Sequence, residues 1–131
     1  FGPRPKFDIH VRINKKERRA AMAALIAEKI RENRVVILHE ESMQNPKTKT
    51  LAGFFDKVEI GAKRALVVAP SDEGEKSNGR LNLFKSVRNL PKKECAFVSQ
   101  LNGYALARCR DLVVLESALD QFISILGGSH A

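Results

Sequence analysis

Basic side chains gather at the start of two predicted helices, one that follows Asn14 and one that begins at Asn45-Pro46. The first turn of a helix has unpaired backbone N–H groups and a partial positive charge, so a cation there opposes the helix dipole. The same N–H groups and cations together form a good site for a phosphate. We therefore predict phosphate contacts at both helix starts, from Lys15, Lys16, Lys47 and Lys49.

Positive charge is concentrated at the N-terminal end of the chain. The net charge is +8, and residues 1–19 alone hold seven basic and two acidic side chains, a net charge of +5. Such a segment is typical of an arm that binds a polyanion such as RNA, although a solvated surface without a partner would have the same charge. The helix starts favour RNA, and the segment adds as candidate RNA-binding residues Arg4, Lys6, Arg12, Arg18 and Arg19.

Apolar residues at helical spacing alternate along the chain with short, continuous apolar runs. The predicted helices cover about residues 14–33, 45–61, 80–89, 104–109 and 119–126, and the predicted strands cover residues 35–38, 65–69, 96–98 and 112–115. Continuous apolar strands are typical of a parallel sheet covered on both faces. The predicted fold class is therefore α/β, with a four-stranded parallel sheet flanked by helices.

The first predicted helix has a clear start and one apolar face. Asn14 and Glu17 have the spacing of a capping box. The apolar residues that recur at helical spacing behind them are Met22, Leu25, Ile26 and Ile30. We expect this face to pack against the sheet.

Residues 1–13 are predicted to form a basic extended arm, and residues 14–131 a globular RNA-binding domain. Four apolar residues alternate with polar ones in the arm: Phe7, Ile9, Val11 and Ile13. A period of two is typical of an extended segment with one buried face. We expect residues 7–13 to lie against the domain and to direct His10 and Arg12 toward RNA, while residues 1–6 become ordered only on RNA.

The carboxyl ends of the strands offer an alternative site, because ligands of open α/β sheets bind there. Neither a G-x-G-x-x-G nor a Walker sequence follows any predicted strand, and the loops at Glu40-Glu41 and Asp72-Glu73 have the wrong charge for phosphate. The glutamate pair is similar to the acidic pair of a receiver domain, but no aspartate ends a central strand. His10, His39 and His130 are scattered along the chain.

These observations predict that the protein is not an enzyme and uses neither a cofactor nor a metal. A small α/β enzyme or regulatory domain that binds a ligand at the strand ends remains the alternative. A module that binds an acidic protein is a third hypothesis. Strong binding of a nucleotide, flavin or methyl donor would favour the enzyme.

Two further features concern the compartment. Cys95 and Cys109 stand outside any disulfide or zinc pattern, so we predict reduced, buried thiols. No apolar run approaches the roughly 18 residues that span a membrane, and the first residues lack a signal-peptide pattern. We expect a cytosolic or organellar protein without a membrane partner.

Several motifs occur in order across nearly the whole chain: residues 1–6 with 14–20, 46–49 (P-K-T-K), 86–91 (S-V-R-N-L-P), 101–104 (L-N-G-Y) and 113–119. Together they resemble the L4 family of bacterial-type large-subunit ribosomal proteins. The resemblance implies a Rossmann-like, three-layer domain that binds large-subunit ribosomal RNA and supports subunit assembly and translation in a cytoplasmic or organellar ribosome.

The resemblance also implies neighbouring ribosomal proteins as partners and, in some members, repression through the protein's own messenger RNA. It adds Arg88 and Asn89 to the candidate RNA-binding residues. The N-terminal segment of the family and its loop along the peptide exit tunnel have no counterpart in these 131 residues. We therefore expect no tunnel function from them.

Overall fold

A computed structural model describes residue 2 and residues 11–39, 47–71 and 77–127, without the side chains of residues 77–81. The helices are α1 (Lys15–Arg31), α2 (Thr48–Lys57), α3 (Ser77–Arg88), α4 (Gly103–Arg108) and α5 (Leu119–Leu126), with 3-10 turns η2 (Val98–Gln100) and η3 (Glu116–Ala118). The strands are β1 (Val35–Leu38), β2 (Ala65–Ala69), β3 (Lys93–Phe97) and β4 (Asp111–Leu115).

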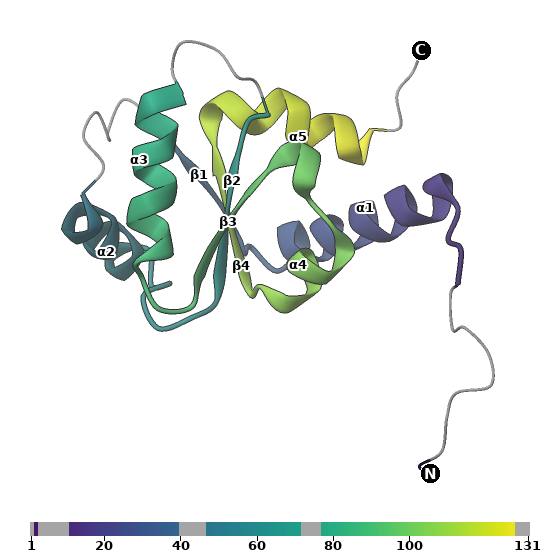
Figure 1. Cartoon of the computed structure of the whole chain (residues 1–131), viewed down its shortest axis with the longest axis horizontal. Coiled ribbons are helices and arrows are strands. Elements are labelled where there is room, and N and C mark those ends of the chain that lie inside the picture. The colour runs from purple at the N-terminus through teal and green to yellow at the C-terminus, as the bar shows by residue number, and fades with distance from the viewer. Residues whose placement is uncertain (1, 3–10, 40–46, 72–76, 128–131) are drawn as a thin grey trace.

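The four strands form one parallel sheet in the order β1-β4-β2-β3. Helices α2 and α3 cover one face, and α1, α4 and α5 cover the other (Figure 1). The central strands β2 and β4 are buried along their whole length, as their continuous apolar runs predict. The predicted three-layer α/β fold is confirmed.

The start of α1 follows the predicted pattern, and its end closes in a left-handed turn. At its start the backbone N–H of Asn14 donates to Glu17 Oε2 at 3.3 Å, which confirms the capping box. At its end Asn33 adopts φ 54°, and Arg34 N–H donates to Lys29 O at 2.9 Å. This is the left-handed closure that asparagine tolerates well.

The predicted bounds of α2 are wrong at both ends. Its first intrahelical hydrogen bond runs from Leu51 N–H to Lys47 O, so Lys47 is the N-cap and the helix begins at Thr48, not at Asn45-Pro46, which lies outside the described residues. The helix ends at Lys57 because Glu59, at φ 59°, closes it before Gly61 is reached.

Strand β3 begins three residues earlier than predicted, at Lys93, which pairs with Ala65 of β2. Lys93 is buried although it is charged. Its Nζ donates to the carbonyls of Ile60 and Gly61 at 3.0 Å and of Lys63 at 2.7 Å, and it lies 5.1 Å from the Phe55 ring centre. Burial lowers the pKa of Lys93, and neighbouring Lys92 lowers it further. Val98, predicted in the strand, instead opens η2.

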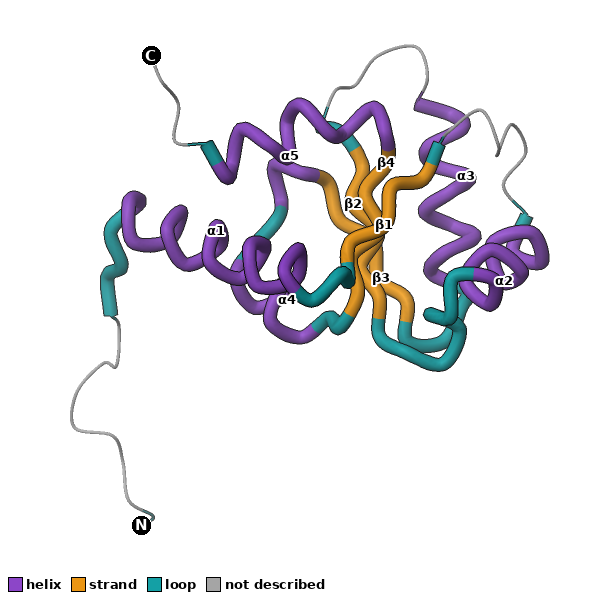
Figure 2. The backbone as a smooth tube through the Cα atoms, turned by 180° about the vertical axis from the view of Figure 1, so that it is seen from behind, coloured by secondary structure: helices purple, strands orange, loops and turns teal. Residues whose placement is uncertain are grey.

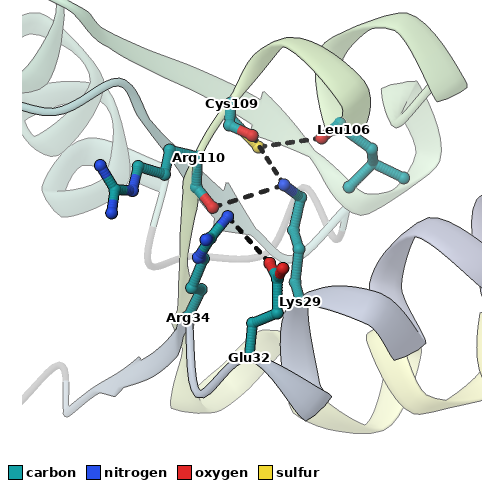
Figure 3. Close-up of polar contacts among 6 residues, drawn as sticks. All are labelled: Lys29, Glu32, Arg34, Leu106, Cys109 and Arg110. Atoms are coloured by element: carbon teal, nitrogen blue, oxygen red, sulfur yellow. Dashed lines mark hydrogen bonds and ion pairs between the residues drawn. The ribbon is translucent and has the colours of Figure 1, made fainter.

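A second buried lysine corrects the predicted face of α1. Met22 and Ile26 are buried, but Ile30 is 47% exposed, and Lys29 lies inward in its place. Lys29 Nζ donates to Cys109 O at 2.6 Å and to Arg110 O at 3.4 Å (Figure 3). These charge-assisted hydrogen bonds hold the end of α1 against the turn between α4 and β4.

The predicted buried face of the arm is wrong where it is described. Val11 is 77% exposed and Ile13 is 57% exposed, while Phe7, Ile9 and His10 lie outside the described residues. The segment leads into the end of α1 that projects beyond the sheet (Figure 2). Period-two alternation alone therefore did not identify a buried face.

Candidate nucleic-acid interface

The start of α1 is a fully exposed cationic surface. Every residue from 11 to 20 is exposed, and Glu17 is the only acid among them. Its carboxylate accepts the N–H of Asn14, and no ion pair to a basic residue of this segment occurs in the described part of the chain. We name this surface the α1 start; its cations are Arg12, Lys15, Lys16, Arg18 and Arg19.

A second cationic surface lies between α2 and α3. A cleft of about 390 Å³ is lined by Thr48, Lys85, Ser86, Arg88 and Asn89, none of which is acidic. The N–H groups at positions 48–50 precede the first intrahelical hydrogen bond of α2, so they are donors without an intrahelical partner. We name this site the α2–α3 cleft. Its donors match the needs of a phosphate.

The structure therefore places the predicted residues in two groups. Arg88 and Asn89 line the cleft, and the exposed Lys47 and Lys49 flank Thr48 along the chain. The α1 start lies on the opposite side of the sheet from α2 and α3 (Figures 1 and 2). Arg4 and Lys6 lie outside the described residues. Thus the predicted residues that the structure describes do not form a single continuous patch.

The carboxyl ends of the strands hold polar groups that pair with one another. His39 Nδ1 lies 2.7 Å from Glu116 Oε2, and both side chains are more than half exposed. The N–H of Ser99 donates to Ser71 Oγ at 2.8 Å. Within the described residues, no three histidine, cysteine or acidic side chains are grouped to hold a metal ion, and no helix is long and apolar enough to cross a membrane.

Both cysteines are free thiols, as predicted. Cys109 is buried and its Sγ donates to Leu106 O at 3.3 Å, while Cys95 is half-buried. Burial raises the pKa of the Cys95 thiol to about 12. At neutral pH the thiolate needed for nucleophilic or metal chemistry is therefore disfavoured at Cys95.

Comparison with known proteins decides the family. The sequence model of the ribosomal protein L4/L1 family matches residues 1–125. The chain belongs to this family. The chain is also 34% identical over 121 residues to the large ribosomal subunit protein uL4 of Azobacteroides pseudotrichonymphae, a match that covers 91% of the chain and 54% of that relative.

Two further relatives carry the same name. The uL4 proteins of Phocaeicola vulgatus and Oenococcus oeni are each 32% identical, with 96% and 97% of this chain matched. The matches cover 57% of each of those relatives, so the L4-family chain spans about half the length of the curated relatives it matches. Thr48 of the P-K-T-K motif and Ser86, Arg88 and Asn89 of the S-V-R-N-L-P motif line the α2–α3 cleft together.

Sequence analysis of this L4-family chain missed several cations. Lys85 lines the cleft beside Arg88, one turn earlier on α3. A basic residue also stands directly before each of the four strands: Arg34, Arg64, Lys92 and Arg110. Arg34 and Arg64 stand directly before the predicted apolar runs, but Lys92 and Arg110 were separated from theirs because the predicted starts of β3 and β4 were too late.

Proposed function

We propose that this chain is an RNA-binding, structural part of the large ribosomal subunit, without catalytic activity, in the cytoplasmic ribosome. It would hold ribosomal RNA through the α1 start and the α2–α3 cleft, beside neighbouring ribosomal proteins. The uL4 names of its relatives support its place in the large ribosomal subunit, and the geometry of the two surfaces supports the RNA contacts. Its arm, residues 1–13, would extend the first surface.

The observation that carries this proposal is the α1 start. Its five cations lie within eight residues, are all exposed and make no described ion pair. Lys15 and Lys16 oppose the helix dipole and so bring no stability to the helix that carries them. RNA phosphates would supply the missing counter-charge, chiefly through recognition of backbone and shape.

A charge-reversal experiment tests the proposal. Combined Lys15→Glu, Lys16→Glu and Arg19→Glu changes should weaken binding to large-subunit ribosomal RNA by about 100-fold or more at ~0.1 M salt, because three phosphate contacts are lost. Each lost contact should also make the slope of log K against log salt shallower by about 0.9. The thermal midpoint should stay the same or rise slightly. Filter binding and thermal melting measure the two quantities.

The corresponding glutamine variant is the graded control, and it should bind more tightly than the glutamate variant. Unchanged RNA affinity in the glutamate variant, or wild-type affinity for heparin equal to that for ribosomal RNA, would overturn the proposal. A structured messenger RNA of its own operon offers the same phosphates. We propose that it competes for the α1 start, and the glutamate variant should lose both RNAs together.

A further inference from the structure

The N-terminal edge of the sheet carries a row of cations that the proposed function does not use. Parallel strands begin at one edge, so the residues that precede them come together there. Ala65 is in register with both Lys93 and Asp111, which places Arg64 between Lys92 and Arg110. We name Arg64, Lys92 and Arg110 the edge row.

Backbone hydrogen bonds hold this row in place. The N–H of Arg110 donates to Arg64 O at 2.9 Å, and the N–H of Ala65 donates to Lys92 O at 3.1 Å. Neighbouring strands lie about 4.8 Å apart, so the three positions span roughly 10 Å. Arg64 and Lys92 lie near the end of α4, where they line one small pocket together with Arg108, Cys109 and Glu94.

The charges of the row are not neutralised within the described part of the protein. Two nearby acids are already engaged, since Glu32 pairs with Arg34 at 2.8 Å and Glu94 pairs with Arg108 at 3.3 Å. The third, Asp111, is buried beside Arg110 and makes no ion pair among the described residues. Neither Arg64 nor Arg110 has an ion-pair partner among the described residues, and both are exposed. In Figure 3 the Arg110 side chain extends away from Lys29 and Cys109.

The fold gains little from the charges of these side chains. Like charges at matching positions on adjacent strands are destabilising. Lys92 also adopts φ 59°, a left-handed conformation that favours glycine. Its Nζ makes one exposed hydrogen bond, to Ala62 O at 3.3 Å, and leaves two donors for another partner. A lysine at this position therefore points to a role outside the fold.

We propose that the edge row is a second RNA-binding surface, which takes backbone phosphates of an RNA segment other than the one held by the α1 start. The proposal rests on the proposed function. Arginine forks match phosphate oxygens, so Arg64 and Arg110 equip the edge row for this ligand. The α1 start is separated from the row by the length of α1, roughly 25 Å.

A matched pair of variants tests the edge row. Arg64→Gln with Arg110→Gln removes two charges from the row, and Lys57→Gln with Lys63→Gln removes two charges outside it. The row variant should bind large-subunit ribosomal RNA about 10- to 50-fold more weakly at ~0.1 M salt, with a salt slope shallower by roughly 2. The control should change affinity less than about threefold. Hydroxyl-radical footprinting should show protection lost at an RNA segment that the α1-start variant still protects.

Each result decides the proposal. If the row variant binds like its control while the α1-start variant binds weakly, the edge row is not an RNA site and the proposed function stands. If neither variant weakens binding, the proposed function fails as well. If the row variant binds RNA normally but loses a protein from reconstituted subunits, the row contacts protein and the RNA proposal is overturned. Thermal melting of all variants excludes unfolding as the cause.

Discussion

The two edges of the sheet differ in how their polar groups are satisfied. At the carboxyl edge the described groups pair with one another, as in the contact of His39 with Glu116 and the hydrogen bond from Ser99 N–H to Ser71 Oγ. At the N-terminal edge, Arg64 and Arg110 lie close to other cations and make no described ion pair. Among the described residues, these polar groups of the first edge find partners within the protein, and Arg64 and Arg110 of the second edge form no ion pair.

This difference runs against the usual geometry of α/β folds, whose ligands lie beyond the carboxyl ends of the strands. Fold class alone would point to the carboxyl edge, away from the edge row. Charge left without a counter-charge is the better guide, because like charges held together by register destabilise a protein unless something else binds them. Three predictions test this comparison.

The largest expected effect is a difference in the free energy of unfolding between variants of two neighbouring lysines at the N-terminal edge. Lys93→Met keeps the side-chain length but leaves three carbonyls without their donor, so the free energy of unfolding should fall by about 1–3 kcal/mol. Lys92→Met, one residue earlier, removes a single exposed hydrogen bond and should change it by less than about 0.5 kcal/mol. Urea denaturation of both variants measures the difference.

RNA binding should show the reverse order. Lys92→Met should weaken it, whereas folded Lys93→Met protein should bind as the wild type does. Equal losses of stability in the two variants would mean that exposure does not distinguish these lysines, and the edge row would then be part of the fold.

Sequence reasoning succeeded where the signal was local. The capping pair Asn14 and Glu17 marks the start of α1, and the apolar runs of β2 and β4 identify a covered parallel sheet. Both features depend on residues a few positions apart in the chain. The cationic start of α1 could be predicted for the same reason.

The remainder depends on contacts between distant residues. Lys29 and Lys93 look like surface residues until the carbonyls that surround them are known, some 80 and 30 positions away. The edge row likewise needs the strand order, because Arg64 and Arg110 become neighbours only when β2 pairs with β4. Burial of Val11 was predicted from alternation, but alternation cannot show whether a partner surface exists.

A smaller effect is expected from the backbone of Lys92. Lys92→Gly should raise the free energy of unfolding by about 0.5–1 kcal/mol, because glycine adopts φ 59° without strain, and should weaken RNA binding about fivefold to tenfold by loss of one phosphate contact. Glu59 has the same φ, so Glu59→Gly is the matched control. It should stabilise the fold equally without weakening RNA binding. Weaker binding in both variants would show that the turn conformation, rather than the Lys92 charge, affects RNA.

The smallest effect compares one substitution at the two edges. Glu94 and Glu116 are each about half exposed and each make one ion pair, with Arg108 and His39 respectively. Glu94→Gln should tighten RNA binding about twofold to fivefold, because it frees Arg108 beside the edge row and removes an acid that repels phosphate. Glu116→Gln removes the same charge at the far edge, where screening at ~0.15 M salt limits its reach to about 8 Å, and should change affinity less than twofold. Both variants should keep their stability within about 0.5 kcal/mol, as expected for exposed pairs.

Fluorescence anisotropy with a labelled fragment of large-subunit ribosomal RNA can resolve these differences in affinity. Equal tightening by the two variants would mean that RNA responds to net charge alone, and the distinction between the two edges would be lost.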